Sequence, residues 1–375
     1  MSLLYPTYAE VNLEHIEHNI RLIKGHINNK KLLIAVKANG YGHGAVAISK
    51  MAEKKGLVDM FGVATTPEAI ELRKHGIRLP ILKFSHPFPC EIDSLIDNNI
   101  TITVVDETII SILQEKAKKK KREVKVHLKI DTGMGRIGCF PEEASKLCCF
   151  IEDNCPNLRL EGVFTHLPAS SDSKQRGITQ QQIVKFKQCI DEIEKNIGRN
   201  IDLVHCANSG GIVMHPNSWF NMVRSGILIY GYQPDSQSVE VLKLRRALSL
   251  YSSVSFVKKV GKGTPIGYGG TWIAPKDTFI ATFPAGYADG ISKLLSNKGH
   301  VLIKGKKCPI VGQVCMDQTM VDLGENTTVK MGDKVTIIGK DNDVEITADD
   351  IARLIGTISY DVTCSIGERV TRLYQ

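Results

Sequence analysis

The stretch Leu32-Leu33-Ile34-Ala35-Val36-Lys37-Ala38-Asn39-Gly40-Tyr41-Gly42-His43-Gly44 joins a short apolar run to a lysine and a glycine-rich segment. The apolar run is typical of a strand buried on both faces, and Lys37 is expected at its end. Burial lowers the pKa of a lysine amine and makes the amine a usable nucleophile or base. A lysine at a strand end more commonly reaches back to solvent, so this segment alone leaves both readings open.

Similar apolar or β-branched runs recur along the chain and alternate with segments of helical periodicity. The runs are Leu32–Lys37, Phe61–Ala64, Ile81–Phe84, Ile102–Val105, Val124–Ile130, Leu160–His166, Leu203–Ala207 and Met222–Tyr230. Two of the helical stripes are Leu13, Ile16, Ile20 and Ile23, after Asn12 as a helix cap, and Ile183, Phe186, Ile190 and Ile193. Eight such units over about 230 residues predict an α/β fold, a (β/α)8 barrel of the TIM type. An open doubly wound sheet is the alternative that periodicity does not exclude.

The pattern changes after about residue 245, where helical stripes disappear until Ala348–Ile355. The strand-like runs there are Leu248–Val257, Thr278–Phe283, Val301–Ile303, Thr319–Asp322 and Lys334–Ile338, with Gly and Pro between them. We therefore expect a barrel domain over residues 1–244 and a mostly β domain over 245–375. The first ~12 residues could instead join the β domain.

The composition excludes several classes of function. A chain of 375 residues with 42% hydrophobic residues, 23% charged residues and a net charge of +8 is an ordinary globular protein, with no reason to expect nucleic acid as a partner. The basic stretch from Lys116 to Arg122 is best explained as a solvated helix face. No apolar run approaches the ~18 residues of a membrane span, and Met1–Pro6 lacks the features of a secretory signal.

The ten cysteines also bear on the compartment and on metals. None forms a C-x-x-C pair, and no spacing of histidine and cysteine suggests a zinc site, so no metal is expected. Many lie within apolar runs, where a free cysteine behaves as a small hydrophobic residue. This usage predicts a reducing compartment, the cytoplasm.

Polar residues gather where the predicted barrel strands end, which is where barrels carry their functional groups. They are Lys37 and Tyr41; Lys129, Asp131 and Arg136; His166; Asn208 and Ser209; and Arg224, Gly226 and Ile227. The last two strands of such barrels often hold a phosphate with a hydroxyl and backbone N–H groups. Together with a nucleophilic lysine, this set suggests a phosphorylated aldehyde held as a Schiff base, usually pyridoxal 5′-phosphate. Each residue alone has a commoner structural explanation, and only their joint placement favours this one.

The chain resembles the alanine racemase family in several segments that occur in the family's order. They are Ala35–Gly44, Lys129–Arg136, Thr165–His166, Ala207–Ser209, Val223–Ile227, Gly267–Thr271, Gly286–Gly290, Cys315–Gln318 and Ile358–Tyr360. The lysine segment and Gly286-Tyr287-Ala288-Asp289-Gly290 are specific when taken together. The resemblance implies a homodimeric, pyridoxal phosphate-dependent enzyme that interconverts L- and D-alanine, a small amino-acid substrate, and supplies D-alanine for peptidoglycan.

The resemblance also implies roles for individual residues. Lys37 would bind the cofactor and act as one acid/base, and Tyr268 of the partner subunit would be the other. Arg224 would face the pyridine nitrogen and His166 would hydrogen-bond Arg224. The remaining cofactor-binding residues would be Tyr41, Asn208, Ser209, Gly226, Ile227 and Tyr360. The substrate-binding residues would be Arg136, Met316 and Asp317, supported by Lys129, carbamylated in some relatives, and by Tyr287 and Tyr360 at the access channel.

Some positions depart from the family pattern. Gly40 replaces a common alanine, Ser225 replaces a frequent proline, and Gly270 and Trp272 are unusual neighbours of Tyr268. These departures leave open a serine or broad-spectrum amino-acid racemase. A basic amino-acid decarboxylase would place a carboxylate against the pyridine nitrogen, which Arg224 argues against. A pyridoxal phosphate carrier would lack the residues after position 245.

Overall fold

The computed structural model describes residues 4–234 and 241–375, and their packing divides the chain into two units. The barrel unit comprises His15–Gly40 and the described part of Ala45–Arg245. The β-rich unit comprises the described residues up to Glu14, Tyr41–Gly44 and Arg246–Gln375. The domain boundary at residues 244/245 stays a prediction, and the assignment of residues 41–44 to the β-rich unit was not anticipated. The prediction about a signal in Met1–Pro6 falls partly on residues 1–3, which lie outside the described residues.

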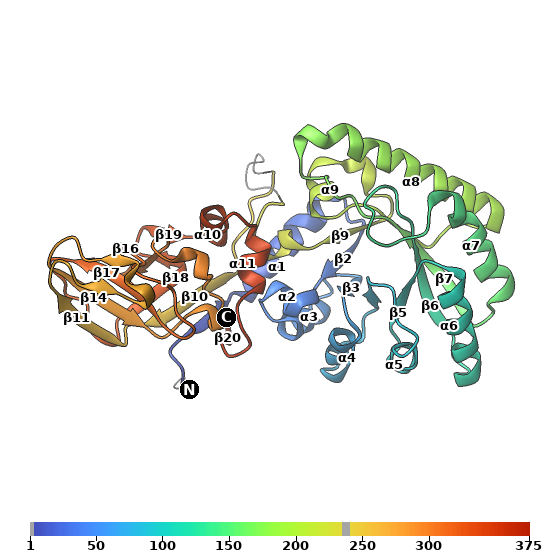
Figure 1. The fold of residues 1–375 in the computed structure, drawn as a ribbon. Coiled ribbons are helices and arrows are strands. Elements are labelled where there is room, and N and C mark those ends of the chain that lie inside the picture. The colour runs from blue at the N-terminus through green and yellow to red at the C-terminus, as the bar shows by residue number, and fades with distance from the viewer. Residues whose placement is uncertain (1–3, 235–240) are drawn as a thin grey trace. The chain divides into compact units, whose positions relative to one another are not determined.

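The barrel unit contains a closed parallel barrel whose last strand pairs with its first, Lys31 opposite Met222 (Figure 1). Its strands are β2 (Lys31–Ala35), β3 (Met60–Val63), β4 (Ile81–Lys83), β5 (Thr101–Val104), β6 (Val124–Lys129), β7 (Leu158–Phe164), β8 (Leu203–His205) and β9 (Met222–Ser225). Closure confirms the predicted (β/α)8 barrel and excludes the open sheet, because an open sheet leaves two unpaired edge strands.

Helices precede the first barrel strand and connect the successive barrel strands. They are α1 (Leu13–His26), α3 (Ala45–Lys54), α4 (Thr66–Lys74), α5 (Ile92–Asp97), α6 (Glu107–Lys120), α7 (Pro141–Asn154), α8 (Arg176–Ile197) and α9 (Ser209–Met214). The 3-10 helices are η1 (Ser173–Gln175), η2 (Pro216–Ser218) and η3 (Ile227–Tyr230). Ile16, Ile20 and Ile23 of α1 are buried, as the helical stripe predicts. In α6, Lys116 and Lys120 form ion pairs with Asp93 and Asp97 of α5, whereas Lys118 and Lys119 are exposed, so the basic stretch is largely a solvated helix face, as predicted.

Several predicted barrel strands are shorter than expected, and two of them give way to a helical turn. The first barrel strand ends at Ala35 rather than Lys37, because the chain then enters the short turn α2 (Lys37–Tyr41). The last ends at Ser225, and Ile227–Tyr230 forms a 3-10 helix that the apolar run Ile-Leu-Ile-Tyr does not distinguish from a strand. An apolar run indicates that a segment is buried, but it does not indicate whether the backbone is a strand or a helix.

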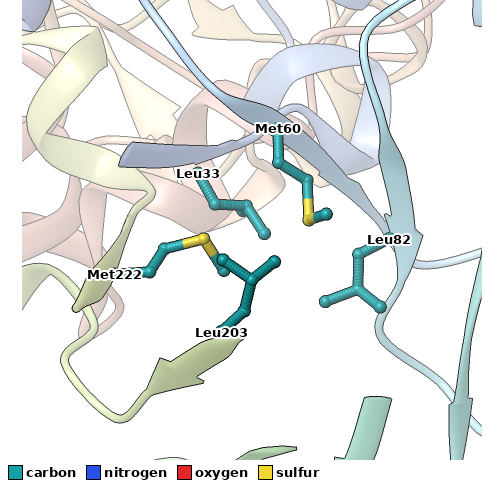
Figure 2. Packing of buried hydrophobic residues seen from close by; sticks show 5 residues of the cluster. All are labelled: Leu33, Met60, Leu82, Leu203 and Met222. Carbon is teal, nitrogen blue, oxygen red and sulfur yellow. The ribbon is translucent and has the colours of Figure 1, made fainter. Parts of the chain in front are cut away.

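The barrel interior contains a purely apolar layer and a polar one. Leu33, Met60, Leu82, Leu203 and Met222 form the apolar layer, in which the side chains from five strands converge (Figure 2). Nearer the carboxyl ends of the strands, the interior holds charged and aromatic side chains instead. The apolar layer is close-packed and rigid, and it supports the polar side chains that lie nearer the carboxyl ends of the strands.

The β-rich unit contains three sheets. The largest has the order β16-β15-β18-β10-β1-β20, with β19 also paired to β18, and the others have the orders β11-β14-β17 and β12-β13. The strands are β1 (Tyr8–Val11), β10 (Leu248–Ser253), β11 (Phe256–Val260), β12 (Pro265–Ile266), β13 (Trp272–Ile273), β14 (Thr278–Phe283), β15 (His300–Ile303), β16 (Lys306–Pro309), β17 (Thr319–Gly324), β18 (Lys334–Asp341), β19 (Val344–Ile346) and β20 (Thr371–Tyr374). The helices are α10 (Ala348–Ile355), α11 (Ser359–Cys364), η4 (Tyr268–Gly270), η5 (Tyr287–Asp289) and η6 (Lys293–Leu295).

The β-rich unit confirms the mostly β character predicted for this part of the chain and corrects one strand. The run Leu248–Val257 is two strands, β10 and β11, which belong to different sheets. Strand β1 pairs with β10 and β20, so Tyr8–Val11 joins this unit, the alternative left open by the sequence. No helix within residues 4–234 and 241–375 is long and apolar enough to cross a membrane.

Candidate active site

Lys37 stands at the start of a left-handed turn. Ala38, Asn39 and Gly40 have φ values of 51°, 50° and 63°, a region that only glycine enters without cost. Two side chains hold the turn: Glu68 accepts the Ala38 N–H at 2.6 Å, and Asn39 accepts the Ala45 N–H at 3.0 Å. Lys37 itself is half-buried. The turn therefore fixes the backbone from which the lysine side chain projects at the carboxyl end of β2.

Lys129, the last residue of β6, is 3% exposed and lies among other cations. Burial lowers the pKa of its amine to about 7, and the charges of Arg136, Arg224 and Lys37 contribute to the lowering. A substantial part of Lys129 is therefore neutral at neutral pH. The structure thus brings together four candidate residues that belong to three barrel strands or to the segments after them: Lys37, Lys129, Arg136 and Arg224. Their common charge suits an anionic ligand.

Arg224, in β9, is held by the barrel interior. Its Nη1 donates to the His205 carbonyl at 2.8 Å and to His205 Nδ1 at 3.0 Å, and its Nη2 donates to the Thr165 carbonyl at 2.8 Å. Nη2 also contacts the Cys206 carbonyl at 3.2 Å. Within the described chain these bonds use the terminal nitrogens and leave the Nε–H as the remaining donor.

Burial lowers the pKa of Arg224 to about 10, still far above neutrality, so the guanidinium stays charged. His166 follows β7 and contacts Arg224, with 3.4 Å between its Nδ1 and Nη2. Burial and then the charge of Arg224 hold the pKa of His166 well below its ordinary value. His166 is therefore a neutral acceptor beside a permanent cation, which is the arrangement that the resemblance implies.

The loop after β6 is organised by Asp131. Its Oδ1 accepts the N–H groups of Gly133 and Met134, and its Oδ2 accepts the Gly135 N–H at 2.8 Å. This carboxylate fixes the loop that ends in the exposed Arg136. Asp131 is therefore a loop-shaping residue, and Arg136 remains the group in this loop that can meet a ligand.

The candidates after β8 and β9 are joined to one another. Ser209 Oγ, at the start of α9, accepts the Gly226 N–H at 3.1 Å, which places Ser209 beside the Gly226–Ile227 segment. Asn208 is used within the protein, because its side chain accepts the Gly211 N–H, accepts the Ser170 hydroxyl and donates to the Leu167 carbonyl. The structure thus supports Asn208 as the residue that shapes this loop.

Tyr41 and Tyr360 lie together in the β-rich unit, with 5.9 Å between their ring centres. Burial raises the pKa of both hydroxyls well above the ordinary value. Both side chains therefore remain neutral hydrogen-bond donors at all physiological pH values, which suits contact with a phosphate.

The other candidates of the β-rich unit lie on its surface. Tyr268 is 72% exposed, Met316 is 53% exposed and Tyr287 is 45% exposed. The Met316 N–H makes no hydrogen bond within the described residues. Asp317 is exposed, and its carboxylate accepts a hydrogen bond from Arg369 at 2.8 Å. Exposed apolar side chains in such a group are typical of a surface that another chain covers.

A chain of buried polar groups behind Arg224 was not predicted from the sequence. His205 Nε2 lies 2.9 Å from His127 Nδ1, and His127 Nε2 lies 3.3 Å from Glu161 Oε2. Because Arg224 donates to His205 Nδ1, the His205 proton is on Nε2, and the same reasoning places the His127 proton on Nε2. The chain therefore runs from the Arg224 cation to the Glu161 anion. Phe164 stacks on His205 with centres 4.8 Å apart.

The charge of Glu161 is stabilised by this chain and by Lys125. Burial alone would raise the pKa of Glu161, but hydrogen bonds from His127 and Lys125 outweigh burial and lower it to about 2. Gly162 makes room for the chain, because a Cβ atom there would meet the His127 ring at 2.7 Å. A positional signal was available: His127 and His205 occupy inward positions of two strands, but a lone histidine in an apolar run is usually structural.

The two fully buried histidines predict a loss of stability in mild acid. Burial lowers the pKa of His127 and holds that of His205 well below its ordinary value. Their unfolded forms bind protons below about pH 6.5 while the folded forms do not, so stability present above that pH is lost as the pH falls. The loss between pH 7 and pH 5 is expected to be larger for His205 than for His127, because the contact with Glu161 partly offsets the effect of burial on the pKa of His127.

Urea unfolding at the two pH values measures this loss. The chain has two tryptophans, Trp219 in the barrel unit and Trp272 in the β-rich unit, so Trp272→Phe makes fluorescence report on the barrel alone. In that background His205→Gln should show a smaller loss between pH 7 and pH 5, whereas His300→Gln, at an exposed position, should show the full loss. An equal loss in all three proteins would contradict the assignment.

Comparison with known proteins gives a consistent result over the whole chain. Residues 11–234 match the family model described as alanine racemase, N-terminal domain, and residues 247–374 match the one described as alanine racemase, C-terminal domain. The chain is 45% identical over 369 residues to an alanine racemase of Cutibacterium acnes, covering 98% of each protein. A solved alanine racemase of Clostridium difficile superposes with a TM-score of 0.94 at 37% identity, covering 100% of this chain and 97% of that one. The alanine racemase of Bacillus anthracis with bound L-Ala-P superposes with a TM-score of 0.93 at 34% identity, covering 100% and 96%.

Proposed function

Because the chain belongs to the alanine racemase family, we propose that it interconverts L-alanine and D-alanine, supplying D-alanine for peptidoglycan. Inversion at Cα requires one group to take the proton from one face and another to return a proton to the opposite face. We assign these roles to Lys37 and to Tyr268 of the partner subunit. The observation that carries the proposal is the cationic cluster of Lys37, Lys129, Arg136 and Arg224 at the carboxyl ends of the barrel strands.

The residues present fit pyridoxal 5′-phosphate as the cofactor. Lys37 would bind it covalently, Ser209, Gly226 and Ile227 would hold its phosphate with the hydroxyls of Tyr41 and Tyr360, and Asn208 would shape the phosphate loop. The Arg224 Nε–H is a donor not used within the described chain and is available to the ring nitrogen. When bound, pyridoxal phosphate withdraws electrons from the substrate Cα and so weakens the bond to its proton.

Arg224 sets the strength of that electron withdrawal. An arginine donates a hydrogen bond but does not give up its proton, so the ring nitrogen opposite Arg224 would stay unprotonated. The chain from Arg224 through His205 and His127 to Glu161 fixes the guanidinium in place. We infer that this arrangement limits electron withdrawal to what proton exchange needs and discourages transamination. His166 would couple Arg224 towards Tyr268.

Arg136 and the free Met316 N–H are the groups that we assign to the substrate carboxylate, with Asp317 in a supporting role through Arg369. Tyr287 and Tyr360 would narrow the access channel and so limit the size of the substrate side chain. The aromatic walls favour a small amino acid. Serine differs from alanine by one hydroxyl, and a hydrophobic wall discriminates weakly against such an addition. Serine therefore remains the substrate against which selectivity has to be measured.

Lys129 is expected to react with carbon dioxide to form a carbamate. The reaction needs a neutral amine, and the pKa of about 7 provides one at pH 7.5. The product is an anion between the cations Arg136 and Arg224, which stabilise it. Intact mass measured under mild conditions with bicarbonate present should show an added carbon dioxide that is lost in acid. Lys129→Gln serves as the control, and an unmodified wild-type mass under those conditions would contradict the expectation.

A homodimer would complete the proposed site. Tyr268 and Met316 are largely exposed in the isolated chain, where water would compete for both the phenol and the Met316 N–H. A second copy that covered them would exclude that water and strengthen their interactions with substrate. We also infer a reducing compartment such as the cytoplasm, because the buried cysteines of the described chain carry free thiols; they are Cys139, Cys148, Cys155, Cys189, Cys206 and Cys308.

An absorbance spectrum followed by chiral analysis tests the function. The purified protein should show a band near ~420 nm that borohydride removes, as a lysine-bound pyridoxal phosphate does. L-alanine should then give D-alanine well ahead of D-serine from L-serine. Comparable rates would make the protein a broad-spectrum racemase, and a band without racemisation would overturn the proposed activity.

A further inference from the structure

A fully buried carboxylate lies at the centre of a group of hydrogen bonds in the β-rich unit. Asp289 is 0% exposed, and its Oδ2 accepts the Gly286 N–H at 2.8 Å. Arg369 binds the same carboxylate through two nitrogens, Nε at 2.7 Å and Nη2 at 2.9 Å. The Tyr5 hydroxyl is 3.3 Å from its Oδ1. Such a two-pronged contact between arginine and a carboxylate is the strongest and most directional ion pair that proteins form.

Arg369 also reaches a second carboxylate. Its Nη2 donates to Asp317 Oδ1 at 2.8 Å, so one planar guanidinium joins a buried carboxylate to an exposed one. The Arg369 side chain is 42% exposed and that of Asp317 is 58% exposed. An isolated exposed ion pair would contribute little to stability. Here the buried ion pair with Asp289 fixes the position of the Arg369 guanidinium. The contact of that guanidinium with the exposed Asp317 therefore has a defined geometry.

The two carboxylates belong to segments that are bonded to each other through their backbones. The Tyr287 N–H donates to the Cys315 carbonyl at 3.0 Å, and the Ala288 N–H donates to the Met316 carbonyl at 3.1 Å. Gly286 permits this approach, because a Cβ atom there would lie 2.2 Å from the Cys315 carbonyl oxygen. The turn that contains Tyr287 and the loop that contains Met316 are therefore held together by backbone hydrogen bonds. The Arg369 side chain links the same two segments.

We propose that Arg369 is a positioning residue for substrate binding: with Asp289 as its anchor, it holds Asp317 and thereby sets the orientation of the Met316 N–H. This inference rests on the proposed function, in which that N–H binds the substrate carboxylate. It gives Asp317 an indirect role, because Asp317 Oδ1 accepts a hydrogen bond from Arg369. Arginine is required, since a lysine at position 369 has one nitrogen and cannot make this planar contact with both carboxylates.

Asp317→Asn is the principal test, because it weakens the exposed contact and leaves the buried pair intact. The KM for L-alanine should rise about fivefold with kcat nearly unchanged, since the lost interaction acts on binding. Propionate, which has the carboxylate of alanine but no amino group, should lose affinity as an inhibitor by the same factor. If Asp317 instead contacted the substrate ammonium, propionate inhibition would be unchanged, and the proposal would be overturned.

Two further variants make the test specific. Arg369→Gln should raise KM at least as much as Asp317→Asn, and the double variant should add no further increase, because both act through one contact. Lys276→Gln breaks a comparable exposed ion pair, that with Glu325 at 2.7 Å, and should leave KM and propionate inhibition as in the wild type. Equal KM values in Asp317→Asn and the wild type would also contradict the inference. Failure of the wild type to racemise alanine would refute the proposed function instead.

Discussion

Replacement of Lys37 by alanine is expected to abolish racemisation and the absorbance band near ~420 nm together. The side chain is assigned both the covalent link to the cofactor and the proton transfer on one face, so no residual route retains either function. Loss of a group that acts as both nucleophile and base typically lowers the rate by about 10⁴-fold or more. Spectra and chiral analysis on the same preparations, after addition of pyridoxal phosphate, measure both effects.

A variant on the same strand provides the control. Lys31 is the exposed first residue of β2, so Lys31→Ala removes a lysine without reaching the carboxyl end of the barrel. It should retain both the band and the activity. Lys37→Arg keeps the positive charge but cannot form the same covalent link, and it should behave like Lys37→Ala. Racemisation by either Lys37 variant at a rate near that of Lys31→Ala would show that the nucleophile has been assigned wrongly.

Tyr268→Phe is expected to lower the rate of racemisation by about 10²- to 10⁴-fold, the usual contribution of one acid/base group. The loss should fall on proton exchange at one face only. In deuterated water, one enantiomer of alanine should still exchange its Cα proton without inverting, because Lys37 remains, while exchange of the other should be nearly lost. Tyr251→Phe, in the same unit but on β10, is the control and should racemise normally.

Mixing the two inactive proteins tests whether the site is shared between subunits. A heterodimer of Lys37→Ala and Tyr268→Phe has one site with both substitutions and one with neither, if Tyr268 serves the partner's lysine. Random exchange of subunits should then restore activity to about a quarter of the wild-type value. No recovery after proven exchange would mean that Lys37 and Tyr268 act within one chain, or that one of them is not catalytic.

The architecture of the barrel was predictable because its strands are buried on both faces. The run Leu32–Val36 has no polar interruption, and the spacing between such runs leaves room for one helix between strands. The placing of candidate residues at strand ends followed from the same periodicity, because parallel strands present all their carboxyl ends at one side. Lys129 is the last residue of β6 and Arg224 lies within β9, while their roles stay proposals.

The conformation at Lys37 and the polar layer were not predictable in the same way. A strand and a left-handed turn both satisfy the pattern Ala-Val-Lys-Ala-Asn, since the turn depends on hydrogen bonds that the Glu68 carboxylate and the Asn39 side chain accept from the backbone. His127, Glu161 and His205 are separated by more than 30 residues, and their contacts depend on strand register inside the barrel. No local sequence pattern encodes such register.

Roles in the β-rich unit were the least accessible from sequence. The sequence shows Asp317 only as a carboxylate next to Met316. In the structure Asp317 pairs with Arg369, a residue that lies 52 positions later. The same holds for Asp289, whose segment was identified by its resemblance and not by the buried ion pair that explains it. Contacts between distant loops are decided by packing, and the sequence supplies only the participants.

The left-handed turn after Lys37 also restricts the genetic variation that this chain can tolerate. Each non-glycine residue in that conformation costs about 1–2 kcal/mol, and a β-branched side chain costs more. Ala38, Asn39 and Tyr41 already carry this cost, and Gly40 is the position that escapes it. Mutations to valine, isoleucine or threonine at these sites would therefore be removed by selection for stability alone, even where they left the chemistry untouched. The segment would change slowly between lineages for a backbone reason as well as a catalytic one.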